Sequence, residues 1–245
     1  MSDPSSGRLR TGVRLARRWL GSLVGLDVWQ RPEVAVRTVR LGDAGGRWAI
    51  AAEGLGLGAV VYACGVGTDV SFERDLIARY GVTVHGFDPT PLSLAWAAGR
   101  QLPPGFHLHP YGVADYDGTA RFAPPRKLKF PSFSMVREGG VGSAVEAPVR
   151  RLATLRESLG LPPPDVLKLD IEGAEYAVLA DLLAGECRPA QLLVEFHHRW
   201  REVGARRTRE AIARLRGAGY RVAEVAPNGL EFTFVKAGGT GSGAR

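Results

Sequence analysis

The sequence predicts an α/β fold, in which a doubly wound sheet of seven strands ends in an antiparallel hairpin. From residue 59 onward, apolar β-like runs alternate with amphipathic helical segments, which is typical of a mostly parallel sheet. Near the end of the chain, two β-runs flank Pro227-Asn228-Gly229, and an Asn-Gly pair between such runs is a strong hairpin signal. The expected strands cover residues 59–63, 82–87, 106–113, 166–171, 191–196, 220–225 and 230–235.

Helices are expected between these strands. Phe72, Leu76 and Tyr80 share one stripe of a helix over residues 71–80, and Gly81 stands where that helix must end. The other expected helices cover residues 91–98, 154–159, 174–183 and 208–215.

One stretch interrupts the alternation. Residues 118–122 are expected to form a short edge strand, and residues 123–147, which are rich in proline and glycine, are predicted to form a long mobile loop. A structureless loop of this length inside a compact domain is usually functional, so we expect it to border the binding site.

The chain is predicted to divide into an N-terminal extension, a main domain and a flexible tail. The extension covers residues 1–55 and contains a basic amphipathic helix over 8–24 and a hairpin over 34–52, outside the main sheet. The main domain covers residues 56–237 and the tail residues 238–245.

Charge and cysteine content restrict the classes of function. Residues 1–40 hold eight arginines against three acidic residues, a net charge of +5 within a chain of +7. Such a segment can contact nucleic acid or anionic lipid, and a solvated terminal helix is the alternative. No apolar run approaches the length of about eighteen residues that a membrane span needs. The two cysteines form neither a disulfide framework nor a zinc pattern, so a reducing cytoplasm is expected.

The first candidate site is the glycine turn after the first strand of the alternating part. Gly65 and Gly67 let the backbone approach a ligand closely, and the following helix offers free N–H groups. A pyrophosphate ligand would require a third glycine at position 70, which is Val70. The pattern therefore favours a nucleoside ligand without phosphates, and a tight turn that binds nothing is the alternative.

The next two strands end in further polar positions. Asp88 ends its strand 23 residues after Gly65, where a carboxylate can accept hydrogen bonds from both hydroxyls of a ribose. Its alternative role is to cap the helix that follows Pro89. Ala114 and Asp115 follow the third strand, where the base of the nucleoside is expected. For Asp117 and Gly118, which come shortly after, a surface turn is nearly as good an explanation.

Acidic residues and a histidine gather after the later strands. Asp170 and Glu172 end one strand, and Glu195 and His197 end its expected neighbour. A histidine beside carboxylates is suited to take a proton from a hydroxyl, and the same set of groups could hold a divalent cation. The alternative is that Glu195 pairs with an arginine and His197 caps a loop.

At this point the residues resemble a family. Lys168-Leu169-Asp170-Ile171-Glu172-Gly173-Ala174-Glu175, Leu193-Val194-Glu195-Phe196-His197 and Phe87-Asp88-Pro89 resemble the motifs of FkbM-type methyltransferases, a branch of the class I S-adenosylmethionine-dependent enzymes. The resemblance covers roughly residues 45–236. It implies a Rossmann-like sheet and methyl transfer from S-adenosylmethionine to a small-molecule acceptor, most often to an oxygen of a sugar or natural product.

The resemblance also implies roles for residues. The cofactor-binding set is Tyr62, Cys64, Gly65, Gly67, Asp69, Asp88, Pro89, Ala114, Asp115 and Asp170. The branch often has an acidic residue where this chain has Tyr62 or Cys64, which leaves Asp69 or Glu73 to meet the amino-acid part of the cofactor. The catalytic set is His197 as the base, with Asp170, Glu172 and Glu195 orienting it or the acceptor. Arg47, Trp48 and the loop over 123–147 are candidates for the acceptor pocket.

Other functions stay open at this stage. A nucleic-acid methyltransferase would use the basic extension to bind RNA, but no stacking aromatics are interleaved with its arginines. A non-catalytic protein that retains the fold and a nicotinamide oxidoreductase are further alternatives, and Val70 and the final hairpin disfavour the last of these. No residue is assigned as a metal ligand, although a divalent cation stays possible, and the sequence is compatible with a homo-oligomer.

Overall fold

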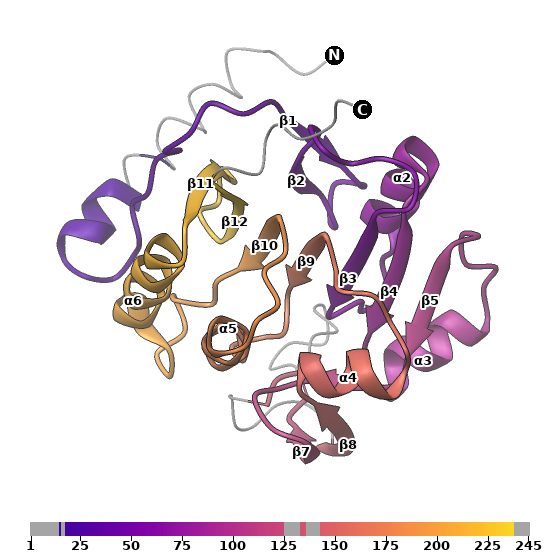
Figure 1. Cartoon of the computed structure of the whole chain (residues 1–245). Helices are drawn as coiled ribbons and strands as arrows, with labels where there is room; N and C mark the ends of the chain where they lie inside the picture. Colours follow the sequence, from indigo (N-terminus) through magenta and orange to yellow (C-terminus); the bar gives the residue numbers. More distant parts are fainter. Residues whose placement is uncertain (1–14, 16–17, 125–132, 136–142, 238–245) are drawn as a thin grey trace, which may run out of the picture.

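The computed structural model describes residues 15, 18–124, 133–135 and 143–237 (Figure 1). Most of the predicted basic helix, parts of the predicted loop and the predicted tail lie outside these residues. Residues 18–23 are helical, within the predicted helix. The boundaries at residues 55 and 237 stay a prediction.

A seven-stranded sheet forms the centre of the molecule, with the order β11-β12-β10-β9-β3-β4-β5. Neighbours from β10 to β5 run parallel, whereas β12 is antiparallel to both β10 and β11. The structure thus confirms the predicted fold class and its terminal hairpin. The strands are β3 (Val60–Cys64), β4 (Thr83–Phe87), β5 (Phe106–His109), β9 (Val166–Leu169), β10 (Gln191–Glu195), β11 (Tyr220–Val225) and β12 (Glu231–Lys236).

The strand order reverses between β3 and β9. The chain proceeds outward from β3 through β4 to β5, returns to β9 beside β3, and then proceeds outward in the other direction. In an open α/β sheet, ligands bind outside the carboxyl ends of the strands at such a switch point. The topology therefore places a binding crevice above the ends of β3 and β9.

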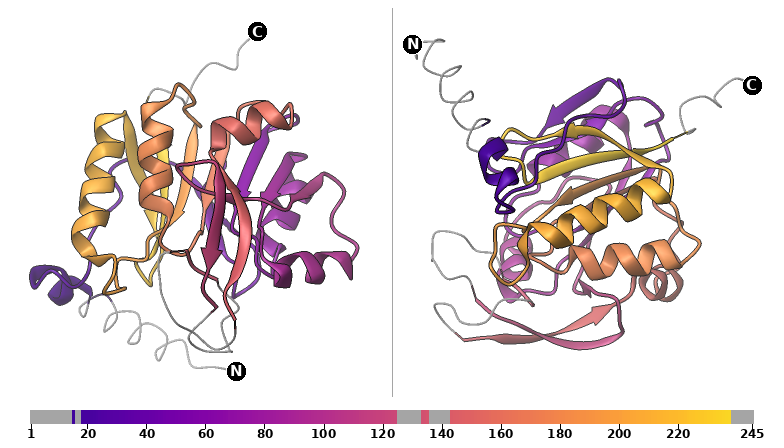
Figure 2. Two further views of the ribbon diagram at one scale, coloured as in Figure 1. Left: turned by 90° about the horizontal axis from the view of Figure 1, so that it is seen from below. Right: turned by 90° about the vertical axis from the view of Figure 1, so that its left-hand side faces the viewer.

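The two faces of the sheet are covered differently. Tyr62 and Cys64 of β3 face a core with α5 and α6, whereas Val61 and Ala63 face a core with α2 and the hairpin β1–β2. Figure 2 shows α5 and α6 stacked on one side of the sheet and the violet hairpin on the other. The helices are α2 (Ser71–Tyr80), α3 (Pro91–Ala98), α4 (Leu152–Ser158), α5 (Glu175–Ala184) and α6 (Gly204–Gly217).

The N-terminal hairpin forms outside the main sheet, as predicted. β1 (Thr38–Leu41) and β2 (Trp48–Ala51) make a separate two-stranded antiparallel sheet. The Thr233 hydroxyl donates to the carbonyl of Ala49, and the Gln191 amide bonds both backbone groups of Ala51. These contacts hold the hairpin against β10 and β12, and bring Trp48 toward the switch point.

Two predictions of elements were wrong. The expected strand over 106–113 ends at His109, because Pro110 has no N–H for the ladder, and the chain continues as β6 (Gly112–Val113) in another sheet. β6 pairs with β8 (Val145–Arg150), which pairs with the predicted edge strand β7 (Gly118–Phe122). The predicted loop thus ends before residue 145. Its last residues begin a strand with alternate buried positions, a pattern that the neighbouring prolines obscured.

Candidate functional site

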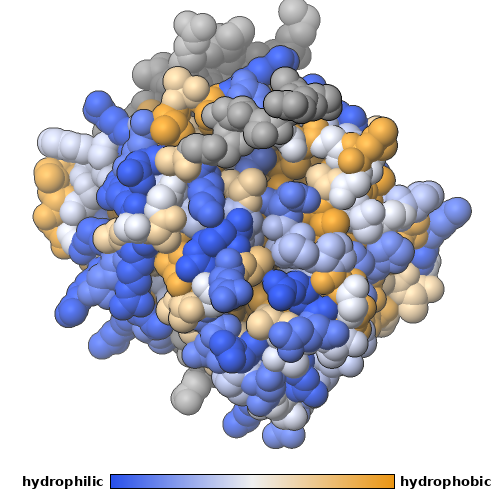
Figure 3. Space-filling model, viewed as in Figure 1, coloured by the Kyte–Doolittle hydropathy of each residue, from blue (hydrophilic) through white to orange (hydrophobic). Residues whose placement is uncertain are grey.

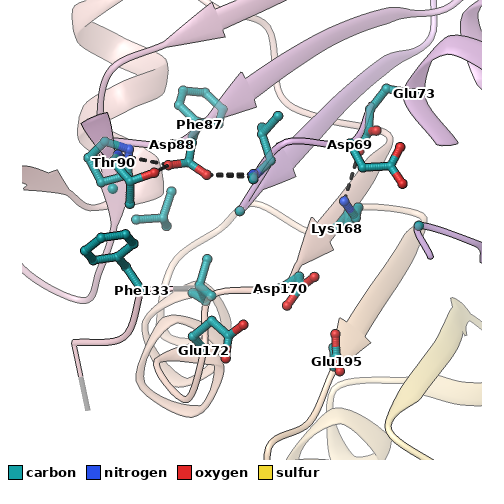
Figure 4. Close-up of a pocket in the computed structure, with 18 of the residues that line it drawn as sticks. Asp69, Glu73, Phe87, Asp88, Thr90, Phe133, Lys168, Asp170, Glu172 and Glu195 are labelled. Atoms are coloured by element: carbon teal, nitrogen blue, oxygen red, sulfur yellow. Dashed lines mark hydrogen bonds and ion pairs between the residues drawn. The ribbon is translucent and has the colours of Figure 1, made fainter. Parts of the chain in front are cut away.

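A cavity opens at the carboxyl ends of the central strands, at the switch point. Its lining comes from the turns after β3, β4, β9 and β10, from the hairpin β1–β2, and from the small sheet (Figure 4). The lining residues are Gly45, Gly46, Arg47, Trp48, Gly65, Val66, Gly67, Asp69, Glu73, Phe87, Asp88, Pro89, Thr90, Gly112, Val113, Phe122, Phe133, Met135, Lys168, Asp170, Ile171, Glu172, Glu195 and Glu231.

The floor of the cavity requires glycine at position 65. Gly65 has φ +82, and a Cβ at this position would collide with the carbonyl oxygen of Asp170. Its N–H donates to the carbonyl of Phe87 at 3.0 Å. The ends of β3, β4 and β9 therefore meet at one backbone crossing. Gly67 also has a positive φ, +59, but an added Cβ there would meet no atom within 4 Å.

Asp88 is fully occupied by hydrogen bonds within the protein. One of its oxygens accepts from the N–H groups of Val66 and Gly67 at 3.1 and 2.8 Å, and the other accepts from the N–H and hydroxyl of Thr90 at 2.9 and 2.7 Å. A carboxylate offers about four acceptor positions, so none is left for a ribose in this arrangement. Asp88 instead holds the glycine turn to β4, and Thr90, not Asp88, is the N-cap of α3.

A buried ion pair on the opposite side of the glycine turn was missed by the sequence analysis. The Lys168 ammonium lies 3.0 Å from an oxygen of Glu73, and both side chains are buried. Burial alone would lower the pKa of Lys168, but the charges of Glu73 and Asp170 outweigh it and raise the pKa. The second Glu73 oxygen is buried without a hydrogen-bond partner among the described residues. The sequence signal that could have predicted this ion pair is Lys168, a charged residue inside the otherwise apolar strand β9.

Two carboxylates face the cavity without a partner. Neither Asp170 nor Glu195 has a side-chain hydrogen bond or ion pair with the described residues, and Figure 4 shows the two side chains close to each other at the ends of β9 and β10. Burial raises the pKa of Asp170 to about 6, against the opposing charge of Lys168. Burial, reinforced by the charge of Asp170, raises the pKa of Glu195 to about 10. The pair can therefore hold and release a proton.

His197 lies behind these carboxylates, outside the cavity lining. Its Nδ1 is 2.7 Å from Glu175 and its Nε2 is 3.2 Å from Glu172. Burial lowers the pKa of His197, but the two glutamates outweigh it and raise the pKa to about 11. The ring is therefore an imidazolium with both nitrogens protonated. This arrangement argues against the predicted role of His197 as a base, because the ring has no lone pair to accept a proton.

The charge of His197 also decides whether this cluster can bind the divalent cation that the sequence left open. Asp170, Glu172 and His197 bring potential ligand atoms within 4.8 Å of one another. A metal ligand must be a neutral imidazole, and both His197 nitrogens are taken by glutamates. The cluster is better described as an ion network than as a metal centre.

Glu172 has an unusual backbone conformation. Its φ of +52 is the only positive value found for a non-glycine residue in the described part of the chain. The Ser134 hydroxyl donates to its carbonyl at 2.6 Å. Such strain costs energy and persists where the surroundings enforce it, which is frequent at functional sites. Here the segment around Ser134 and the ion pair with His197 fix the turn after β9.

Four of the predicted cofactor residues lie outside the cavity lining. Tyr62 and Cys64 face the opposite core, and the Tyr62 hydroxyl donates to the carbonyl of Pro162 at 2.8 Å. Ala114 is buried within the small sheet and Asp115 is exposed. Gly112 and Val113 line the cavity in place of Ala114 and Asp115, because the chain leaves the main sheet after His109. An apolar wall takes their place, formed by Phe87, Gly112, Val113, Phe122, Phe133 and Met135.

The other predicted residues reach the cavity. Gly65, Gly67, Asp69, Asp88 and Pro89 line one side. Asp170, Glu172 and Glu195 line the other side, and Arg47 and Trp48 also border the space. Sequence reasoning thus located the cavity, and the structure places His197 outside its lining.

The comparisons with known proteins are of two kinds. The model of the FkbM methyltransferase domain matches residues 60–222, more than half of the chain. A search of curated proteins gave no match.

Among solved structures, the chain is similar to an FkbM methyltransferase from Methylobacillus flagellatus KT. The TM-score is 0.46 at 14% identity, over 73% of this chain and 43% of that chain. Fibrillarin from Aeropyrum pernix, in complex with S-adenosyl-L-methionine, gives a TM-score of 0.40 at 10% identity, over 86% and 85%. An O-methyltransferase family 2 protein from Planctomyces limnophilus DSM 3776, in complex with apigenin, gives 0.37 at 13%, over 96% and 62%. The chain spans less than half the length of the first of these structures. By its sequence match, the chain belongs to the FkbM branch of the S-adenosylmethionine-dependent methyltransferases.

Proposed function

We propose that this chain transfers a methyl group from S-adenosylmethionine to a hydroxyl oxygen of a small-molecule acceptor, a sugar or another natural product. The observation that carries the proposal is the pair of unpartnered carboxylates, Asp170 and Glu195, in the same cavity as the glycine turn. One wall of the cavity suits the cofactor, and the facing wall suits an acceptor with hydroxyl groups.

The residues present fit the cofactor. Its positively charged amino group suits the buried, unpartnered oxygen of Glu73, which Lys168 leaves free, and Asp69 lies beside it in the lining. The apolar wall that includes Phe87, Val113 and Phe133 suits an adenine ring. For the predicted ribose contact, Asp88 would have to exchange part of its present hydrogen bonds. When bound, the cofactor supplies an electrophilic methyl group on a sulfonium.

Asp170 is the group that we assign as the base for the acceptor hydroxyl. A general base works best when its pKa lies near the operating pH, and burial brings the pKa of Asp170 to about 6. Glu195, whose pKa is raised to about 10, keeps its proton at neutral pH and donates a hydrogen bond. Glu172 orients this pair, held by the His197 imidazolium. His197 is thus a positioning residue in this proposal.

The charge of the cavity favours a small acceptor over a nucleic acid. Two cationic residues, Arg47 and Lys168, stand among the lining residues. The acidic ones are Asp69, Glu73, Asp88, Asp170, Glu172, Glu195 and Glu231. Such a surface repels a phosphate backbone, which proteins normally contact through lysine and arginine.

Asp170→Asn tests the assignment. We expect it to lower methyl transfer by at least about 100-fold, because a positioned base contributes about that much, while cofactor affinity by calorimetry changes little. Transfer is measured with radiolabelled S-adenosylmethionine against a panel of sugars and phenolic natural products. His197→Gln is the comparison variant, and its turnover should still depend on pH, with the midpoint moved to higher pH because the charge of His197 lowers the pKa of Asp170. Full turnover of Asp170→Asn, or loss of the pH dependence in His197→Gln alone, would contradict the assignment.

A further inference from the structure

Three acidic residues lie on neighbouring strands at one side of the cavity. Asp170 comes directly after β9, and Glu195 is the last residue of β10. Glu231 begins β12 and is the antiparallel partner of Glu195. All three line the cavity, and we call them the acidic rim. Side chains at directly opposite positions of an antiparallel pair lie on the same face of the sheet, so Glu195 and Glu231 are neighbours.

Among the described residues, no cation is paired with the acidic rim. The Lys168 ammonium is bound to Glu73, and Arg47 is exposed and donates to a backbone carbonyl at 3.3 Å. The amide of Asn228 donates to one oxygen of Glu231 at 2.9 Å. The other oxygen of Glu231 is buried and has no hydrogen-bond partner in the part of the chain that the structure describes. The rim thus holds an acceptor atom that a ligand can satisfy.

An acidic rim without a cation is unfavourable for the protein by itself. A buried carboxylate without a partner raises the free energy of the folded state, and like charges at directly opposite strand positions destabilise a sheet. Burial, together with the charges of Asp170 and Glu231, raises the pKa of Glu195 to about 10. A positive group on a ligand would offset this repulsion, whereas a neutral ligand would not.

The negative charge of the rim is a local property of the cavity. The chain as a whole has a net charge of +7. The helix α6 contains five arginines and one glutamate, and Figure 3 shows mostly hydrophilic surface where this helix lies in Figure 1. A cleft with charge of one sign raises the local concentration of ligands of the opposite sign. The cavity therefore selects for positive ligands although the outer surface does not.

The cofactor proposed above does not supply the positive group for Glu231. Its amino group is assigned to Glu73, and its sulfonium lies near the glycine turn after β3 in that arrangement. The strand order places β12 three strands away from β3. Neighbouring strands are about 4.8 Å apart, so β12 lies about 14 Å from β3. The positive group therefore belongs to the acceptor.

A divalent cation fits the acidic rim less well than an ammonium group does. In the described part of the chain, the acidic and histidine side chains that bring their ligand atoms within 4.8 Å of one another are Asp170, Glu172 and His197. This group leaves out Glu195 and Glu231. An ammonium group donates three hydrogen bonds and does not require a closed shell of oxygens at metal distances.

We propose that the acceptor carries a protonated amine close to the hydroxyl that is methylated, as an amino sugar does, and that Glu231 is the residue that selects it. The inference rests on the proposed function, because it places the amine beside Asp170, the group assigned as the base. The amine is bound by Glu231, keeps its proton and takes no part in the transfer.

Binding of matched sugars tests the proposal. With S-adenosylhomocysteine present, 2-, 3- and 4-amino hexoses are compared by calorimetry with the parent hexoses and with their N-acetyl forms, which are uncharged. At least one amino hexose should bind about tenfold or more tightly than both of its neutral partners, because the ammonium gains a charge-assisted hydrogen bond. If no amino hexose binds more tightly than its neutral partners, or if no sugar binds, the proposal is overturned.

Matched variants test the role of Glu231. Glu231→Gln should weaken binding of the amino hexose about tenfold and leave binding of the parent hexose unchanged. Glu157→Gln is the control, since this glutamate is exposed on α4 outside the cavity lining and the variant should bind as the wild type does. Thermal unfolding checks that both variants are folded. Unchanged amine binding in Glu231→Gln would overturn the assignment. So would Mg²⁺ binding, in a titration with magnesium chloride alone, that the wild type shows and Glu231→Gln loses.

Transfer assays distinguish this inference from the proposed function. An O-methyl product from an amino hexose, identified by mass spectrometry, supports both. Methyl transfer to neutral acceptors with the same kcat/KM as to their amino counterparts leaves the proposed function intact and overturns the inference. Amine binding that depends on Glu231 without any methyl transfer supports the amine site and contradicts the proposed function. An N-methyl product contradicts both.

Discussion

The two walls of the cavity differ in how completely their polar groups are satisfied. On the side of β3 and β4, the Asp88 carboxylate accepts four hydrogen bonds and ties the glycine turn to Thr90. On the side of β9 and β10, Asp170 and Glu195 have no such partners among the described residues, and burial raises the pKa of each. The first wall is a preorganised support. The second holds the two carboxylates to which we assign the proposed proton transfer.

The same contrast appears in the backbone. Positive φ values at Gly65 and Gly67 cost little, because glycine adopts them freely. The positive φ of Glu172 is strained, and it is maintained by Ser134 and by the ion pair with His197. The supporting wall is thus unstrained and the reactive wall is held under strain by its neighbours.

Gly65→Ala should have the largest effect on the supporting wall. A Cβ at Gly65 collides with the Asp170 carbonyl and requires a left-handed backbone, so we expect the free energy of unfolding to fall by at least about 3 kcal/mol. Gly67→Ala is the matched control, since its backbone is also left-handed but the space is open, and about 1 kcal/mol is expected. Urea unfolding measures both. Equal losses would show that the crossing of β3 and β9 is not as tight as described.

The next largest loss of unfolding free energy is expected for His197→Gln, on the side of β9 and β10. Removing the imidazolium takes away the positive charge that lies between Glu172 and the buried Glu175, and breaking such a buried ion pair costs about 3 kcal/mol. The effect depends on pH. Because the folded pKa of His197 is about 11 against an ordinary 6.5, its contribution is fully present below pH 6.5 and falls as pH rises toward 11, by up to about 1.4 kcal/mol per unit.

Unfolding free energies measured between pH 7 and 9 test this slope. The wild type should lose stability with rising pH, and His197→Gln should lose less. His107→Gln, at an exposed ring, should keep the slope of the wild type. A variant slope identical to that of the wild type would show that His197 is not the titrating group.

Thr90→Val should have the smallest effect and sharpens the view of the supporting wall. It removes one hydrogen bond to Asp88 and the N-cap of α3, so a loss of about 1–2 kcal/mol in unfolding free energy is expected. Ser93→Ala is the control, because it keeps the bond between Thr90 and Asp88. If the Asp88 network supports the glycine turn, Thr90→Val should also weaken cofactor binding more than Ser93→Ala does. The reverse order in calorimetry would assign the support to another contact.

The pattern of the sequence was sufficient for the architecture. Alternating apolar and amphipathic segments, the Asn-Gly turn at residue 228 and the acidic ends of β9 and β10 are local features, and each follows from backbone and packing preferences within a few residues. They predicted the sheet, its final hairpin and the edge where the cavity lies. The break at Pro110 and the alternation in β8 were also present in the sequence, but prolines nearby favoured a loop.

The tertiary structure decided which polar groups are charged and which are satisfied by hydrogen bonds. Lys168 meets Glu73 across 95 positions of sequence, and His197 meets both Glu172 and Glu175 in a buried space. Whether a histidine is a base or a fixed cation depends on distances and on desolvation, and neither is encoded in the spacing of residues along the chain. For that reason the sequence by itself predicted most of the residues that gather at the switch point. Only the packed molecule decided that Asp88 is satisfied, that His197 is charged, and that Asp170 and Glu195 have no side-chain partner among the described residues.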